Sequence, residues 1–196
     1  DIACGDAQSL GIPLSFGGPY LGFLCTTRAL MRKMPGRIVG ATTDAKGQRC
    51  FVLTLQAREQ HIRRDKATSN ICSNQGLMTL YVAAYMSLMG ADGLREVAFK
   101  GHNMATYLLD AMLAAGGCRL RYPDAPFLNE FLLDLDFDPQ MLIDRCMAEA
   151  AILPGIRVDA KGLLMAATEM QTREDADRLV EIYRQCLAGA NGPVKD

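Results

Sequence analysis

The sequence predicts a protein of the mixed α/β to α+β class, built from two parts of different character. Up to about residue 90, short apolar runs alternate with glycine-rich turns. Beyond Gly90, amphipathic stripes and strands follow one another in the order α-β-β-α-β-β-α, which is typical of a compact two-layer unit. Hydrophobic residues make up 49% of the 196 residues, enough for a sizeable core. We therefore divide the chain into residues 1–89 and residues 90–196.

The apolar runs of the first part predict strands and one helix. Residues 1–5 and 22–27 have the composition of short strands, and we expect the first of them to be buried. Two further runs predict a β-hairpin with its tip at 44–47; they cover residues 37–43 and 49–55. Residues 76–89 are apolar on every face, which predicts a buried helix.

The second part opens with a helix and continues into strands. Asp92 is placed to cap a helix whose apolar stripe runs at i, i+3, i+4 spacing as far as Leu113. Gly116 and Gly117 then end it. Composition predicts four strands in the remainder, at residues 119–122, 130–136, 155–158 and 163–168.

Two more helices are indicated by their start signals. Asp138 followed by Pro139 is an N-cap with proline in the first turn, and the helix should run to about residue 151. Thr172 and Asp175 form a variant of the capping box, which opens a last amphipathic helix through residue 187. Residues 191–196 should form a loose tail.

A polar segment at residues 58–72 stands between two apolar runs. Thr68, Ser69 and Asn70 lie directly before the predicted helix at 76–89, where free backbone N–H groups and the helix dipole favour an anion such as a phosphate. Charged side chains precede them in the same segment. The alternative is an ordinary capped helix after a solvated loop, and the local pattern leaves both interpretations open.

Bulk properties narrow the function classes. The net charge of −1 gives no general attraction to nucleic acid or to a membrane surface, and no run of 18 uncharged apolar residues occurs. Seven widely spaced cysteines without a C-x-x-C pair are typical of a cytoplasmic protein with reduced thiols. The chain starts inside an apparent strand, without Met, so we expect it to be a fragment.

Three motifs in order carry a resemblance to a known family: residues 5–23 (GDAQSLGIPLSFGGPYLGF), residues 34–40 (MPGRIVG) and residues 58–72. The chain resembles the glycine cleavage system P-protein, in the C-terminal part of its first half or separate alpha subunit. The resemblance implies a fold-type-I pyridoxal-phosphate transferase, similar to aspartate aminotransferase. Residues 1–89 would then end the large domain with active-site loops, and residues 90–196 would form the small α+β domain.

The resemblance also implies roles for individual residues. Laying Pro13 and the following glycines on the family pattern puts Gln8 at the position of the Schiff-base lysine, and an amide cannot form a Schiff base. This subunit would therefore not hold pyridoxal phosphate covalently. It would complete a partner's site, with Thr68, Ser69 and Asn70 at the cofactor phosphate and Arg64 as a further contact.

His61 has two interpretations in the same segment. It contacts the glycine carboxylate or the lipoyl arm, or it is a structural histidine. The arginines Arg58, Arg63 and Arg64 likewise either bind a carboxylate or phosphate, or pair with Glu59 and Asp65.

By resemblance, the intact enzyme is an aminomethyl-transferring glycine dehydrogenase. It decarboxylates glycine with pyridoxal phosphate and passes the aminomethyl group to the lipoyl arm of the H-protein. The partners would be a lysine-bearing P-protein subunit and the H-protein, whereas the isolated fragment would be inactive. Two alternatives compete: a purely structural partner subunit without substrate or cofactor contact, and an RNA-binding module, which the absence of interleaved aromatic residues disfavours. Whether the fragment forms a homodimer stays open.

Overall fold

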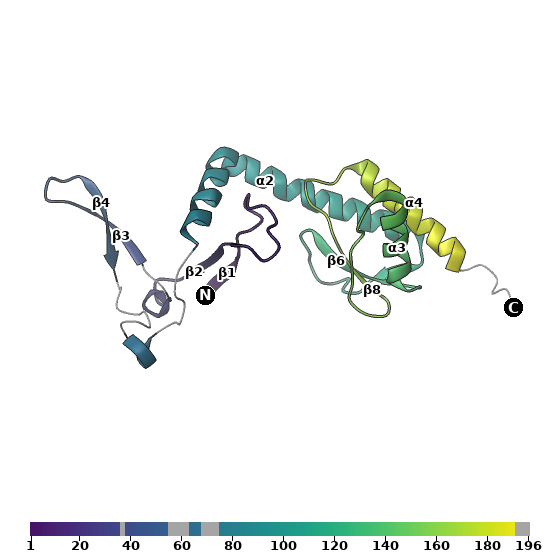
Figure 1. Cartoon of the computed structure of the whole chain (residues 1–196), viewed down its shortest axis with the longest axis horizontal. Coiled ribbons are helices and arrows are strands. Elements are labelled where there is room, and N and C mark those ends of the chain that lie inside the picture. The colour runs from purple at the N-terminus through teal and green to yellow at the C-terminus, as the bar shows by residue number, and fades with distance from the viewer. Residues whose placement is uncertain (36–37, 55–62, 68–74, 191–196) are drawn as a thin grey trace. The chain divides into compact units, whose positions relative to one another are not determined.

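The computed structural model describes residues 1–35, 38–54, 63–67 and 75–190, and the structural statements concern these residues. The chain forms two compact units, Asp1–Met89 and Gly90–Asp196 (Figure 1). Each unit has its own strands and its own apolar cluster, so each is described by itself.

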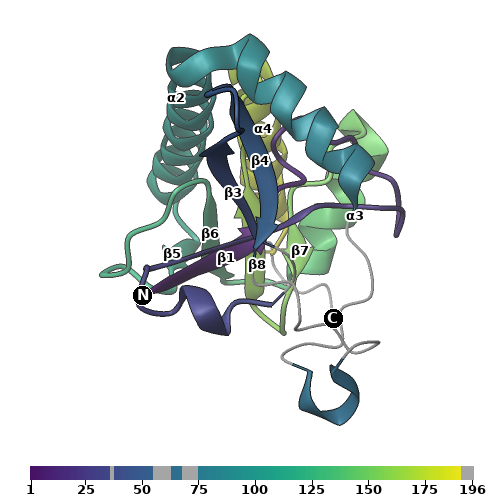
Figure 2. The same cartoon turned by 90° about the vertical axis from the view of Figure 1, so that its left-hand side faces the viewer.

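The first unit contains two separate antiparallel strand pairs. β1 (Ile2–Asp6) pairs with β2 (Gly22–Thr26), and β3 (Ile38–Thr43) pairs with β4 (Arg49–Thr54). Figure 2 shows β3 and β4 side by side. The predicted hairpin is confirmed, because the Asp44 carboxylate accepts the backbone N–H groups of Lys46 and Gln48 at 2.8 and 2.9 Å and so closes the tip.

Two short 3₁₀ helices were not expected from the sequence. η1 covers Met31–Lys33 and η2 covers Arg64–Lys66. Neither is opened by a side-chain cap, and neither buries a residue, so no pattern of apolar spacing marks them.

Two burial predictions in this unit are wrong. All five residues of β1 are exposed, and Ile2 keeps 60% of its surface. Within residues 76–89 only Val82 is buried, whereas Leu77 and Leu88 are 71% and 87% exposed. Both strand pairs are two-stranded, so little else is available within the unit to cover these apolar side chains.

α2 (Gly76–Ala115) joins the two predicted helices into one helix with a bend. The break lies at Gly90, whose φ of 64° and ψ of −176° are not helical. Asp92, which the sequence suggested as an N-cap, instead pairs with Arg95 at 3.1 Å.

By length and composition alone, α2 is the one helix in the described part of the chain that would be able to cross a membrane. Its apolar window has a mean hydropathy of 1.2 and is 6% buried. The bend interrupts it, however: from 76 to 89 the helix has 14 residues, fewer than the roughly 20 that a bilayer requires. The length and composition of α2 are therefore only weak support for a membrane span. They do not explain why the apolar side chains of residues 76–89 are exposed.

The second unit is a two-layer α+β structure. Its antiparallel sheet has the order β5-β6-β8-β7, formed by β5 (Cys118–Leu120), β6 (Glu130–Leu135), β8 (Gly162–Ala166) and β7 (Ile156–Arg157). The second part of α2, α3 (Pro139–Ala150) and α4 (Arg173–Ala190) supply the helices. The predicted order of elements is confirmed.

One face of this sheet makes the core. Leu133 and Leu135 of β6 and Leu163 and Met165 of β8 are fully buried, because alternate residues of a strand point to the same face. Tyr183 of α4 is also fully buried and donates its hydroxyl to the Gly116 carbonyl at 2.5 Å. Burial raises the pKa of the Tyr183 hydroxyl well above its usual value, so it stays a neutral donor.

Both helix-start predictions in this unit are confirmed. The Asp138 carboxylate accepts the N–H of Gln140 at 3.0 Å ahead of Pro139. Thr172 and Asp175 bond reciprocally: the Asp175 N–H donates to the Thr172 hydroxyl at 3.2 Å, and the Thr172 N–H donates to the Asp175 carboxylate at 2.9 Å. The Thr172 N–H and the Thr172 hydroxyl both donate to the Asp175 carboxylate and lower its pKa.

Candidate functional site

The connection between β1 and β2, residues 7–21, holds the position that the sequence singled out at Gln8. Ala7 and Ile12 of this loop are buried together with Val82 of α2. Gly11 has a φ of +88°, and a Cβ there would lie 2.6 Å from the Tyr85 ring. Because only glycine allows this approach, the loop packs closely on the first part of α2.

Gln8 is bonded within its own turn. The Gln8 N–H donates to the Asp6 carboxylate at 2.6 Å, and the Gln8 carbonyl accepts the N–H of Ile12 at 3.0 Å. The side-chain Nε2 then donates to the Ile12 carbonyl at 2.7 Å. The carboxamide is half-buried and engaged, so it closes the turn and offers no nucleophile.

A shallow cavity of about 340 Å³ lies beside this turn, lined by Asp6, Gln8, Ser9, Leu14 and Tyr20. The Tyr20 hydroxyl accepts the backbone N–H of Ser15 at 3.0 Å, and this bond lowers the pKa of Tyr20. The cavity therefore presents hydroxyl and carboxylate oxygens. Such groups accept and donate hydrogen bonds to a polar ligand.

The described lysines are all exposed and belong to other parts of the fold. Lys33 and Lys66 lie in the two 3₁₀ helices, and Lys46 lies at the hairpin tip. Lys100 pairs with Glu96 at 2.8 Å, and the ion pair raises the pKa of the lysine. A Schiff-base lysine is activated by a desolvated site, whereas the side chains of the described lysines are all exposed.

Most of the predicted site residues lie outside the described residues: the phosphate-binding Thr68, Ser69 and Asn70, and also His61 and Arg58. Arg64 is described and exposed, and its carbonyl accepts the N–H of Ala67 at 3.3 Å. Its φ of 52° is left-handed. Within the described segments Arg64 forms no ion pair, and Asp65 is not its partner.

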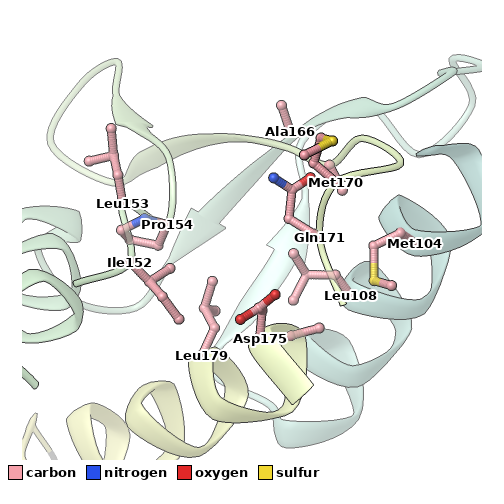
Figure 3. Close-up of a pocket in the computed structure, with 12 residues that line it drawn as sticks. Met104, Leu108, Ile152, Leu153, Pro154, Ala166, Met170, Gln171, Asp175 and Leu179 are labelled. Carbon is pink, nitrogen blue, oxygen red and sulfur yellow. The ribbon is translucent and has the colours of Figure 1, made fainter. Parts of the chain in front are cut away.

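The sequence did not single out a cavity of about 260 Å³ in the second unit (Figure 3). Its walls are mainly apolar and come from α2, α4, the loop after α3 and the end of β8 with the loop that follows it. The polar groups at its edge are Gln171 and Asp175. Their side-chain oxygens already accept hydrogen bonds from Thr168 and Thr172 respectively. The capping-box pattern was the only signal of this place in the sequence.

Other side chains of types that often take part in catalysis are the second histidine, residues able to ligate a metal, and the cysteines. The Nδ1 atom of His102 lies 2.6 Å from the Leu128 carbonyl, and its ring contacts Phe127, as expected of a structural histidine. The described residues contain no cluster of His, Cys, Asp or Glu able to hold a metal ion. Six cysteines are described, and all are free thiols.

Comparison with known proteins gives one consistent family. The model of the glycine cleavage system P-protein matches residues 1–183. The chain is 46% identical over 196 residues to the probable glycine dehydrogenase (decarboxylating) subunit 1 of Nitrosomonas europaea and 48% identical over 182 residues to that of Syntrophomonas wolfei. The two alignments include 97% and 93% of this chain but only 43% and 40% of the relatives, so the chain spans less than half the length of either relative.

Solved structures agree. A crystal structure of glycine decarboxylase (P-protein) of the glycine cleavage system, in inhibitor-bound form, matches 94% of this chain with a TM-score of 0.83 and 45% identity, and 43% of that protein is covered. A sphingosine-1-phosphate lyase of Burkholderia pseudomallei shares the fold at a TM-score of 0.63 and 17% identity. The fold is thus that of fold-type-I pyridoxal-phosphate enzymes, as predicted. The chain belongs to the glycine cleavage system P-protein family.

Proposed function

We propose that this chain is part of subunit 1 of a cytoplasmic glycine dehydrogenase (decarboxylating), and that it completes the active site of a lysine-bearing partner subunit. The observation that carries the proposal is the likeness to the P-protein crystal structure over 94% of the chain. Relatives named subunit 1 at 46–48% identity support the same assignment. The word subunit in those names supports a second polypeptide.

The chain's own residues do not fit covalent attachment of pyridoxal phosphate. Gln8 occupies the apparent lysine position, and its Nε2 is already committed to the Ile12 carbonyl at 2.7 Å. In our proposal the partner supplies the lysine and the cofactor, which serves as the electron sink during decarboxylation of glycine. The aminomethyl group then passes to the lipoyl arm of the H-protein, and the isolated chain is inactive.

The role left to this chain is to bind and orient. We assign Thr68, Ser69 and Asn70 to the phosphate of the partner's cofactor, because hydroxyls and backbone N–H groups before a helix suit an anion. Arg64 is exposed and unpaired among the described residues, so its guanidinium is available to a carboxylate or phosphate. His61 would contact the glycine carboxylate or the lipoyl arm.

The assembled two-subunit enzyme provides the test. Replacing Thr68 and Ser69 together by alanine should weaken cofactor retention at least about tenfold, because one charge-assisted hydrogen bond to phosphate is worth roughly 1.5–3 kcal/mol. Subunit association should persist. Thr42→Ala with Thr43→Ala is a matched control: it also removes two hydroxyls, from exposed positions of β3.

A second function remains in competition, a structural partner that touches neither cofactor nor substrate. The closed turn at Gln8 favours it, since a carboxamide satisfied by its own loop requires no ligand. Normal cofactor affinity and normal glycine–carbon dioxide exchange in the Thr68/Ser69 double variant would establish this function instead. Arg64→Lys also distinguishes the two functions. Lysine keeps the positive charge of the arginine but lacks the planar guanidinium that can bind a phosphate or carboxylate through two parallel hydrogen bonds.

A further inference from the structure

No further inference is drawn: the strongest candidate, the mainly apolar cavity of about 260 Å³ in the second unit between the second part of α2, α4 and the end of β8, carries nothing because its polar side chains Gln171 and Asp175 are exposed to solvent and nothing in the described part of the chain shows what occupies it.

Discussion

Gln8 and Ile12 hold each other through two hydrogen bonds of opposite direction. The Ile12 N–H donates to the Gln8 carbonyl at 3.0 Å, and the Gln8 carboxamide returns a bond to the Ile12 carbonyl at 2.7 Å. Ile12 is 5% exposed, so this clamp fixes the loop at the point where it enters the small apolar cluster of the first unit. The residue at the apparent lysine position is thus tied into the fold.

Removing the donor should open this turn. Gln8→Glu keeps the shape of the side chain but sets a carboxylate against the Ile12 carbonyl, with an expected cost of roughly 1–3 kcal/mol. Hydrogen exchange of the Ile12 amide should accelerate at least about fivefold. Gln48→Glu makes the same change on the exposed β3–β4 hairpin and should leave Ile12 protected. Unchanged exchange in Gln8→Glu would show that the clamp contributes nothing.

The purified chain should not form an internal aldimine with added pyridoxal phosphate. The reason is that Gln8 is an amide and that the described lysines are exposed. The measurement is absorbance of the mixture, followed by borohydride reduction and peptide mapping. A single lysine modified in stoichiometric yield would contradict the assignment, whereas low, scattered labelling is the ordinary reaction of surface amines with an aldehyde.

The second unit could be predicted closely from the sequence, because its signals are local. The cap at Asp138 and the reciprocal bonds of Thr172 and Asp175 depend on residues two or three apart. The alternation in β6 also reports directly which face is buried, since Phe131, Leu133 and Leu135 alternate with exposed or half-buried neighbours. Such patterns need no knowledge of distant contacts.

Burial in the first unit was mispredicted for the opposite reason. An apolar helix such as residues 76–89 indicates only that something covers it, and sequence patterns do not say whether the cover lies in the same unit. Leu88 is 87% exposed, so the described part of the first unit does not supply that cover. The clamp of Gln8 was also missed, because a side-chain bond to a backbone carbonyl four residues away has no distinctive composition.

Two neighbouring glycines after α2 should respond differently to alanine. Gly116 and Gly117 both have left-handed φ values, +79° and +69°, so each replacement costs roughly 1–2 kcal/mol in backbone strain. A Cβ at Gly116 meets nothing within 4 Å, but one at Gly117 would lie 2.1 Å from a Leu187 methyl carbon. Gly117→Ala should therefore cost about 1–2 kcal/mol more.

Denaturant unfolding of the chain, followed by a probe in the second unit, measures the difference. Combining Gly117→Ala with Leu187→Ala removes the collision, so in that background the added cost of Gly117→Ala should fall to that of Gly116→Ala. Equal costs for the two glycines in the parent chain would contradict the steric argument.

The last prediction concerns acid stability and an ion network on the sheet. Arg121 donates from Nη1 to Asp159 at 2.8 Å and from Nε to Asp134 at 2.7 Å. The Arg121 bond, aided by the N–H groups of Lys161 and Gly162, lowers the pKa of Asp159 far below its usual value, and the pKa of Asp134 is lowered mainly by Arg121.

Because both carboxyls have lower pKa values in the folded state, the unfolded chain takes up their protons first as the pH falls below about 4. Their stabilising contribution is therefore complete at neutral pH and is lost progressively in acid. Asp159→Asn should lower the melting temperature at pH 7 and flatten its fall below about pH 4. Asp124→Asn changes an exposed aspartate of the β5–β6 connection, which forms no described ion pair, and should keep the parent profile. Parallel pH profiles for the parent and Asp159→Asn chains would exclude the network as a source of acid sensitivity.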